Sequence, residues 1–384
     1  MNMEFSDTIA ASLSTMFKRY ILATGFGVVL LCVLVLAINS VIDPLWIWKG
    51  NQLQTNRNFI FNERLAKLNL FLKNASSYDC MLFGTSRATT LPAEKIQGAR
   101  CFNMSFSGGS LPEFVAYAKY LKKRGFNPKK VILAIDSFVL RRQNLSKQVP
   151  ACIENQQNPD GILKSYLSLD ALGFSLRTLV NSSPLPRVYD DNFNVYIRDD
   201  APKYHPKLLY PDNPRQDYYD EKALELVKQL FLVFPEAERL AYVPPISIWE
   251  MQRIRKADKQ QNSIRMIYAV SQIAGKLYDF SLPSKLTSRT DNTFDGSHYN
   301  NKTNQLIVNV LNGKRHLDGV LINTSSFEDY SNLVNQRMEL INRSFQAGKQ
   351  AQGGCPRIEA YCGKADFGPL FRLNSFNTAS IRLI

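Results

Sequence analysis

The sequence is poor in the side chains on which most metal and redox sites depend. Its 384 residues include only three histidines and six cysteines, and no group of them has the spacing of metal ligands. Six cysteines in so long a chain are too few for a disulfide-stabilised scaffold. We therefore expect neither a bound metal nor a cofactor.

Blocks of like charge are also absent. The chain carries 47 Lys and Arg against 33 Asp and Glu, a formal net charge of +14, but these residues are dispersed and form no basic tail or recognisable nucleic-acid-binding motif. We expect no nucleic-acid partner. The excess positive charge suits contact with acidic polymers or lipid headgroups. A hydrophobic content of 45% is sufficient for a packed core, so wholesale disorder is excluded.

One long apolar run is present, at residues 20–39. It is uncharged and long enough to cross a hydrocarbon layer of about 30 Å. It is longer than the apolar region of a cleaved signal peptide, and no small-x-small cleavage site follows it. We predict a transmembrane anchor at 20–42 after a cytoplasmic tail at 1–19. Lys18 and Arg19 precede the run, so the main domain should face the periplasm or the cell exterior, as expected for a single-pass protein of a bacterial inner membrane.

The rest of the chain alternates between short apolar runs and amphipathic stretches. The spacing of strand, helix and strand between residues 101 and 136 predicts a βαβ crossover, and hence a parallel sheet covered by helices. Ser110 and Glu113 read as a capping box at the start of the helix in this unit. We expect strands at 79–84, 101–106, 130–136, 239–245 and 276–280, with helices at 59–73, 110–124, 221–232, 250–275 and 302–311.

Two further regions depart from this alternation. Residues 139–219 read as an insertion, with helices at 161–166 and 169–180 before a polar segment. Its tyrosines could stack on sugar rings or pin a long loop to the body: Tyr189, Tyr196, Tyr204, Tyr218 and Tyr219. Residues 321–384 should form a C-terminal helix and tail, in which Cys355 and Cys362 could be paired in an oxidising compartment or remain free.

Two small polar clusters follow predicted strands. Ser86 lies on the turn after the first strand, and Asp295 and His298 follow the last one. A serine hydroxyl needs a base to become a nucleophile, and an imidazole base needs a carboxylate to fix its tautomer, so these three side chains could form a catalytic triad. Each cluster has a structural alternative, since a Gly-x-Ser turn is usually only a turn and an Asp-x-x-His pair is often a helix cap.

The order of these clusters resembles that of the SGNH/GDSL hydrolase superfamily, and within it the membrane-anchored SGNH-like proteins that modify envelope polymers. The matching residues are FGTSR around Ser86, Gly108 or Gly109, and DGSHY from Asp295. The resemblance covers about residues 55–315. It implies a three-layer α/β/α, flavodoxin-like parallel sheet, at 43–320 in this chain. Members are esterases, acyltransferases or accessory proteins, and some work beside a membrane-bound O-acyltransferase.

The chain departs from the superfamily at the block after the third major strand. An oxyanion-hole Asn is usual there, whereas this chain reads Asp136-Ser137-Phe138. Asn103 could take over that role beside the amides of Ser86 and of Gly108 or Gly109. Arg87 could steer an anionic substrate or pair with a carboxylate such as Asp136.

The resulting expectation is a serine esterase or O-acyltransferase that acts on acyl esters, chiefly acetyl esters, of a cell-envelope polysaccharide. The alternative is a catalytically inactive binding or scaffold subunit of an envelope-assembly complex. The missing Asn and the long insertion favour that alternative, whereas the presence of all three triad residues favours the enzyme.

Overall fold

A computed structural model gives the structure of the protein. It describes residues 2–51, 53, 62–146, 149–159, 161–180, 187–189, 195–198, 201–206, 220–256 and 260–351. In residues 2–13, 253–256 and 344–351 it describes the backbone alone. Cys355, Cys362, Tyr218 and Tyr219 lie outside the described residues, so the predictions made for them stay predictions.

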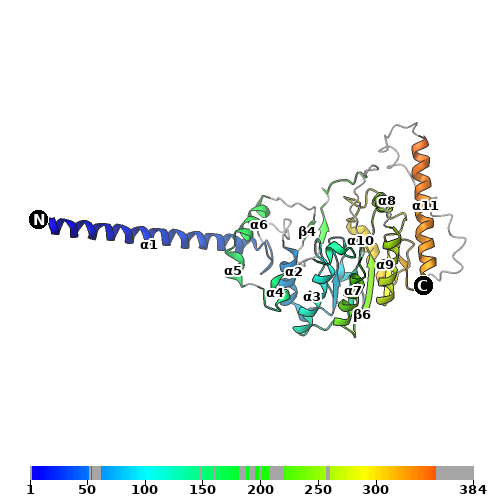
Figure 1. Ribbon diagram of the computed structural model, residues 1–384, viewed down its shortest axis with the longest axis horizontal. Helices are drawn as coiled ribbons and strands as arrows, with labels where there is room; N and C mark the ends of the chain where they lie inside the picture. The colour runs from blue at the N-terminus through cyan, green and yellow to red at the C-terminus, as the bar shows by residue number, and fades with distance from the viewer. Residues whose placement is uncertain are drawn as a thin grey trace.

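The N-terminal helix α1 (Asn2–Ile42) projects from the rest of the molecule (Figure 1). Its segment Ser14–Ile42 is 29 residues long and is apolar enough to cross a membrane. The helix begins well before residue 20, where the predicted span starts. Apolarity sets the limits of a membrane span, but the helix itself continues because residues 2–19 contain no Gly or Pro to end it.

A six-stranded, mostly parallel sheet forms the centre of the domain, in the order β2-β1-β3-β6-β7-β8. The first five strands are parallel and β8 runs antiparallel to β7 at the edge. All five predicted strands are confirmed, and the edge strand was not predicted. The strands are β1 (Cys80–Phe83), β2 (Cys101–Asn103), β3 (Lys130–Ala134), β6 (Glu238–Val243), β7 (Lys276–Asp279) and β8 (Val320–Leu321).

Helices cover both faces of this sheet because its strands are apolar on both sides. Met81 and Phe83 of β1 belong to one buried cluster, and Cys80 and Leu82 to another. The first cluster contains buried residues of α2 (Glu63–Lys73), α3 (Leu111–Lys123), α7 (Lys222–Val233), α9 (Gln260–Ile273) and α11 (Phe327–Ala351). The second is closed by α10 (Asn301–Leu311) and by residues 88–96. Burying each large apolar side chain contributes about 1.5–3 kcal/mol.

The helix predicted at 250–275 corresponds to α8 (Ile248–Lys256) and α9, and residues 257–259 between them lie outside the described residues. One local detail differs from the sequence-based expectation. The predicted capping box is not formed, because the Ser110 hydroxyl donates to Glu113, 2.8 Å away, rather than accepting from a backbone N–H. Glu113 in turn binds Arg64 of α2, at 2.5 Å, so this carboxylate links two helices rather than closing one helix end.

The inserted region contains short elements. They are α4 (Ala151–Glu154), α5 (Ile162–Tyr166), α6 (Leu169–Leu179) and the hairpin of β4 (Arg187–Tyr189) and β5 (Val195–Ile197). Helices α5 and α6 agree with the prediction, whereas the hairpin was not predicted. In Figure 1, α5 and α6 lie at the root of α1.

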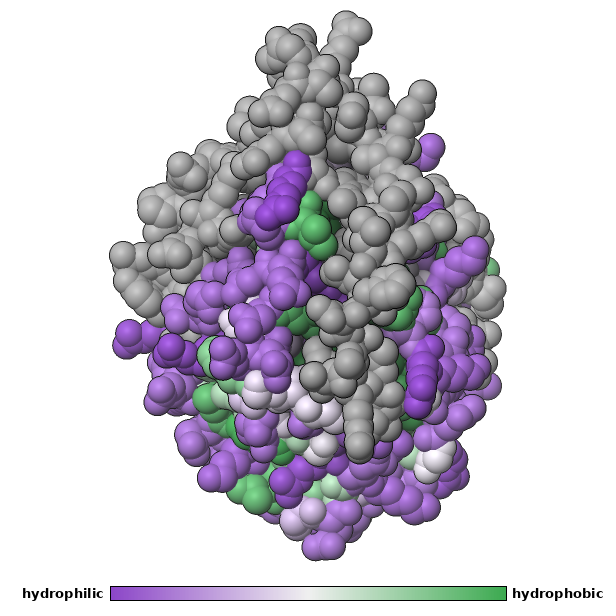
Figure 2. Space-filling model, turned by 90° about the vertical axis from the view of Figure 1, so that its right-hand side faces the viewer, coloured by the Kyte–Doolittle hydropathy of each residue, from purple (hydrophilic) through white to green (hydrophobic). Residues whose placement is uncertain are grey.

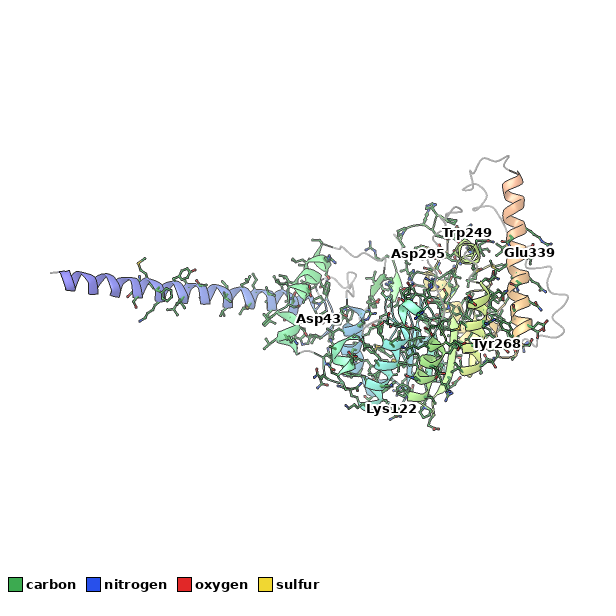
Figure 3. All side chains as sticks on the ribbon, viewed as in Figure 1. Asp43, Lys122, Trp249, Tyr268, Asp295 and Glu339 are labelled. Atoms are coloured by element: carbon green, nitrogen blue, oxygen red, sulfur yellow. A yellow bond between two sulfur atoms is a disulfide. The ribbon has the colours of Figure 1, made fainter. Side chains whose placement is uncertain are left out.

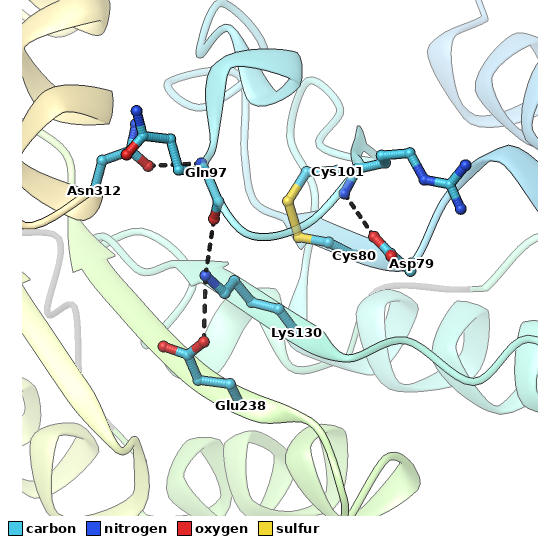
Figure 4. Close-up of a disulfide and its surroundings, with 8 residues drawn as sticks. Asp79, Cys80, Gln97, Cys101, Lys130, Glu238 and Asn312 are labelled. Atoms are coloured by element: carbon cyan, nitrogen blue, oxygen red, sulfur yellow. Dashed lines mark hydrogen bonds and ion pairs between the residues drawn. A yellow bond between two sulfur atoms is a disulfide. The ribbon is translucent and has the colours of Figure 1, made fainter.

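A disulfide joins Cys80 of β1 to Cys101 of β2 (Figure 4). The two residues face each other in the register of neighbouring strands. Beside them, Asp79 accepts a hydrogen bond from the backbone N–H of Arg100 at 2.5 Å. The disulfide therefore ties together the two strands from which both the Ser86 turn and the glycine turn begin.

Candidate active site

Ser86 lies on a tight turn at the carboxyl end of β1. Gly84 begins this turn in close contact with β3, since a Cβ there would lie 2.8 Å from the Cβ of Ala134. The turn is then held by two hydrogen bonds, from Ala88 N–H to the Thr85 carbonyl at 2.9 Å and from the Thr89 hydroxyl to the Ser86 carbonyl at 2.8 Å. The backbone of Ser86 is thus fixed on both sides.

Asp295 and His298 lie on a narrow loop closed by an antiparallel bridge between Thr293 and Tyr299. One oxygen of Asp295, Oδ1, accepts the backbone N–H groups of Ser297, at 2.9 Å, and His298, at 2.8 Å. Gly296 has a φ of +83°, and a Cβ at this position would lie 2.6 Å from the Tyr204 hydroxyl. The Asp-Gly-Ser-His sequence therefore suits this loop because the carboxylate caps it and the glycine permits its turn.

The two loops bring the three predicted triad residues together. His298 Nε2 lies 2.8 Å from Ser86 Oγ. His298 Nδ1 lies 2.6 Å from the second oxygen of Asp295, Oδ2. The ring of Phe294 stacks on the imidazole with centroids 5.4 Å apart. A continuous hydrogen-bonded chain therefore runs from carboxylate to imidazole to hydroxyl, in the arrangement that activates a serine nucleophile.

Electrostatics keep Asp295 ionised in this chain. Desolvation raises the pKa of its carboxyl, but the hydrogen bond and charge of His298, together with the backbone N–H groups of Ser297 and His298, outweigh it and lower the pKa to about 2. An ionised Asp295 favours the tautomer of His298 with its proton on Nδ1. The lone pair of Nε2 then faces the Ser86 hydroxyl and can accept its proton.

Asn103 does not point into this site as an oxyanion donor. Its Nδ2 group donates to the backbone carbonyls of Ala88, Thr89 and Leu91 at 2.9, 3.2 and 3.0 Å, and its Oδ1 accepts from Ser105 N–H at 3.0 Å. Three carbonyls converge on an amide that has only two hydrogens. Asn103 therefore stabilises the loop after Ser86, and the structure does not place its carboxamide as an oxyanion donor.

The glycine turn lies against the Ser86 turn. Gly109 donates its N–H to the Phe106 carbonyl at 3.0 Å, so this amide is engaged within its own turn. A Cβ on Gly109 would lie 3.0 Å from the Gly84 carbonyl, so glycine is needed for close packing there. Gly108 occupies the same turn with a φ of +62°. Of the two glycines, Gly109 supports the turn rather than offering a donor to the site.

Arg87 pairs with Asp136, as one of the two sequence-based alternatives expected. Its Nε lies 3.8 Å from Asp136 Oδ2, and the same oxygen accepts the Thr85 hydroxyl at 2.8 Å. The other oxygen of Asp136 accepts the N–H groups of Phe138 and Val139. The buried Asp136 thus connects the loop after β3 to the Ser86 turn. Arg87 also lines a mainly apolar pocket with Ser137, Val243, Pro244, Ile246, Met251, Leu282 and Met338.

Arg187 of the inserted hairpin was not identified from the sequence, and it reaches the same turn. Its guanidinium donates to the hydroxyls of Thr89, at 2.5 Å, and Ser107, at 2.7 Å, and lies 3.5 Å from Glu63. The hydroxyl of Tyr189, on the same strand, donates to Glu63 at 2.6 Å. No local pattern could reveal these contacts, because they depend on where a distant hairpin docks.

Of the predicted tyrosines that the structure describes, Tyr196 is partly exposed, whereas the other two are packed rather than presented to a cleft. Tyr189 and Tyr204 are both buried, and the Tyr204 hydroxyl lies 3.0 Å from Ser247 Oγ. These two residues favour the interpretation that the tyrosines pin the insertion to the body. Figure 3 shows Asp295 near Trp249 and well away from Asp43 at the root of α1. The ring of Trp249 contacts Tyr204 edge-on.

Comparison with known proteins adds no assignment to this geometry. No protein-family model matches the chain, and no curated protein matches it. Among the residues that the structure describes, no group of three or more His, Cys, Asp or Glu side chains could hold a metal ion. The chemistry of the site must therefore be inferred from the hydrogen-bonded chain itself.

Proposed function

We propose that the protein is a membrane-anchored serine esterase or O-acyltransferase of the SGNH-like class. The observation that carries this proposal is the contact from Asp295 through His298 to Ser86, with distances of 2.6 and 2.8 Å. The sheet gives further support. Its five parallel strands have the order β2-β1-β3-β6-β7, which is the flavodoxin-like order in which ligands bind at the carboxyl ends of the strands.

The reaction would begin with attack of Ser86 Oγ on the acyl carbonyl carbon, while the serine proton passes to His298 Nε2. Collapse of the tetrahedral intermediate breaks the bond from the acyl carbon to the alcohol oxygen, and His298 returns the proton to that oxygen. The acyl group is then held on Ser86. Water or a sugar hydroxyl attacks it, again losing its proton to His298, and Ser86 leaves with that proton.

The oxyanion would be stabilised by the backbone N–H of Ser86 and, as the resemblance implies, by that of Gly108. Asn103 and Gly109 use their donors within the protein, so the site has fewer side-chain and backbone donors than the resemblance implies. Loss of one such donor costs about 10²–10³ in rate. We infer a slow enzyme, as suits one that works on a fixed polymer.

Location and charge support the proposed substrate class. Lys18 and Arg19 precede the apolar segment, which favours a domain that faces outward. The disulfide between Cys80 and Cys101 agrees with an oxidising envelope compartment. A net charge of +14 suits an acidic polymer. We assign the substrate as acyl esters, chiefly acetyl, of a cell-envelope polysaccharide, and a membrane-bound O-acyltransferase as the partner if the reaction is transfer.

The test is mass analysis of envelope polysaccharides from cells that carry a Ser86→Ala allele. Ser288→Ala, which changes a partly exposed serine whose hydroxyl donates to the nearby Lys285 carbonyl, serves as the matched control. An esterase predicts additional acyl groups in the Ser86→Ala cells, and a transferase predicts fewer. Identical acylation in both strains would contradict the proposed reaction.

A second candidate function is a catalytically inactive binding or scaffold subunit of an envelope-modifying complex. The engaged donors of Asn103 and Gly109 favour it, as does the lack of the usual Asn in Asp136-Ser137-Phe138. In this case deletion of the whole chain would alter the polymer, whereas Ser86→Ala would not.

A further inference from the structure

Helices α5 and α6 pack against the end of α1 that enters the domain. Asn39 of α1 donates to the carbonyl of Tyr166 at the end of α5 and accepts from the hydroxyl of Ser175 on α6, both at 2.8 Å. Leu36, one turn earlier on α1, packs against the buried cluster of Leu45, Tyr166 and Ala171. We call residues 162–180 the collar, because they pack against this part of α1.

The position of the collar along α1 places it at a membrane boundary. A helix rises 1.5 Å per residue, so about 20 residues cross a hydrocarbon layer of about 30 Å. Counted from Tyr20, directly after Lys18 and Arg19, the crossing ends at Asn39. The collar contacts α1 at Asn39 and at Leu36, so it lies at the level where the apolar layer ends.

The collar exposes an apolar surface at this level. Leu169, Leu176 and Val180 are 79%, 50% and 73% exposed. Their spacing of i, i+7 and i+11 places them on one face of α6. On another face, Ala171 and Ser175 are buried against the rest of the protein. Ile162, Leu163 and Leu167 of the α5 region are also exposed.

Charged and aromatic residues border this apolar face in the way that a membrane interface requires. Asp170 and Arg177 are exposed on α6. Because they are seven residues apart, they lie on the same face of the helix, beside the apolar one. Trp48, which is partly exposed, contacts the ring of Tyr166 with centroids 5.3 Å apart. Tryptophan is typical of the headgroup level, whereas Tyr166 is buried and supports the Trp48 ring from within the protein. By contrast, the coloured residues at the end of the molecule away from α1 are mainly hydrophilic, with small scattered apolar patches (Figure 2).

We propose that the collar is immersed in the lipid surface, with Leu169, Leu176 and Val180 in the boundary between headgroups and acyl chains. The lipid is the occupant because the exposed face is continuous with the anchor and lies where the anchor leaves the hydrocarbon layer. A single helix would leave the domain free to tilt, whereas a second contact fixes the orientation of the Ser86 site above the bilayer. This inference rests on the proposed membrane anchor but not on the proposed ester chemistry.

The test uses the full-length protein in lipid nanodiscs with an environment-sensitive fluorophore on single cysteines. Cys32, Cys152, Cys355 and Cys362 are first replaced, which leaves Cys80 and Cys101 in their disulfide. The probe is placed at Leu169→Cys, Leu176→Cys or Val180→Cys. Leu31→Cys within the apolar segment of α1 is the lipid-exposed reference, and Leu317→Cys, at an 80% exposed position of the domain, is the water-exposed reference. Quenching by spin-labelled lipids and by aqueous iodide is measured for each.

Immersion predicts lipid quenching of the three collar probes within about two-fold of that at Leu31→Cys, with little iodide quenching. Collar probes that behave like Leu317→Cys, while Leu31→Cys is quenched by lipid, would overturn the collar proposal and leave the anchor in place. Absence of lipid quenching at Leu31→Cys would overturn the anchor and the collar together. Collar probes protected from both quenchers would show that protein covers this face, which also contradicts the proposal.

Discussion

His298 Nε2 lies 2.8 Å from Ser86 Oγ, although the two residues are separated by 212 positions in the chain. Ser86 follows β1, and His298 lies on the loop region after β7, the last parallel strand. Parallel strands place their carboxyl ends at the same edge of the sheet. The contact is therefore a direct consequence of the topology, and it places beside the serine hydroxyl an imidazole that is hydrogen-bonded to Asp295.

Replacing Asp295 by Asn should lower kcat for ester hydrolysis by about 10⁴ while the fold is retained. The amide would hydrogen-bond the wrong tautomer of His298 and would not stabilise the imidazolium. Steady-state kinetics on a soluble aryl ester would measure this change. Asp291→Asn is the matched control, since Asp291 pairs with Arg289 on the surface of a nearby loop, and it should leave kcat within about two-fold.

The pKa of Asp295 also determines how the folded state responds to acid. Because this pKa is lowered from 3.8 to about 2, the native state binds fewer protons than the unfolded chain between these values. The carboxylate therefore stabilises the fold above about pH 4, and this contribution disappears as the pH falls through about 2. The difference in unfolding free energy between the wild type and Asp295→Asn should accordingly shrink between pH 5 and pH 2, and a constant difference would contradict this.

Lys67 should make the protein more stable in mild alkali. The pKa of this lysine is lowered from 10.5 to about 8. Burial is the main cause, and the positive charge of Arg187 adds to it, whereas the negative charge of Glu63 opposes it. Between these values the native state binds fewer protons than the unfolded state, so stability rises with pH. The gain is at most about 3 kcal/mol. Denaturant unfolding in detergent at pH 7.5 and pH 10 would measure it.

The Lys67 effect can be separated from other titrations by substitution. Lys67→Met should remove most of the rise in unfolding free energy, whereas Lys119→Met, at an exposed position of α3, should keep it. An equal rise in wild type and Lys67→Met would show that Lys67 keeps its proton in the folded state.

The Cys80–Cys101 disulfide should contribute about 3 kcal/mol to stability, because it closes a loop with a sequence separation of 21. Cys80→Ala/Cys101→Ala should lower the unfolding free energy by that amount, and a reductant should bring the wild type to the same value. Cys152→Ala, which changes a free cysteine, should leave the response to reductant unchanged. Alkylation of Cys80 and Cys101 in intact cells without reductant would contradict the proposed outward-facing location in an oxidising compartment.

The strands and the three triad residues could be predicted because their signals are local. Each strand is a short apolar run, and Ser86, Asp295 and His298 each follow one of them. The role of Asn103 could not be predicted, since it depends on the path of residues 88–91, which brings three carbonyls to one amide. From the sequence alone, Asn103 could equally hydrogen-bond a substrate or the backbone of its own loop.

The disulfide and the collar were missed for a different reason. Cys80 and Cys101 lie in apolar runs and resemble ordinary buried cysteines, and they can pair only because β1 and β2 are neighbours in register. Helices α5 and α6 were predicted, but which of their faces stays exposed depends on how they pack around Asn39. Such contacts between distant segments leave no periodic signal in either segment.

The most direct test of the account is labelling of the purified full-length protein with a fluorophosphonate, followed by peptide mass analysis. A hydroxyl activated by His298 should form a stable phosphonyl adduct on Ser86. The adduct should be absent from Ser86→Ala, strongly reduced in His298→Ala and unchanged in Ser288→Ala. A wild-type protein that remains unlabelled, or a label that persists in Ser86→Ala, would contradict the assignment of Ser86 as the nucleophile.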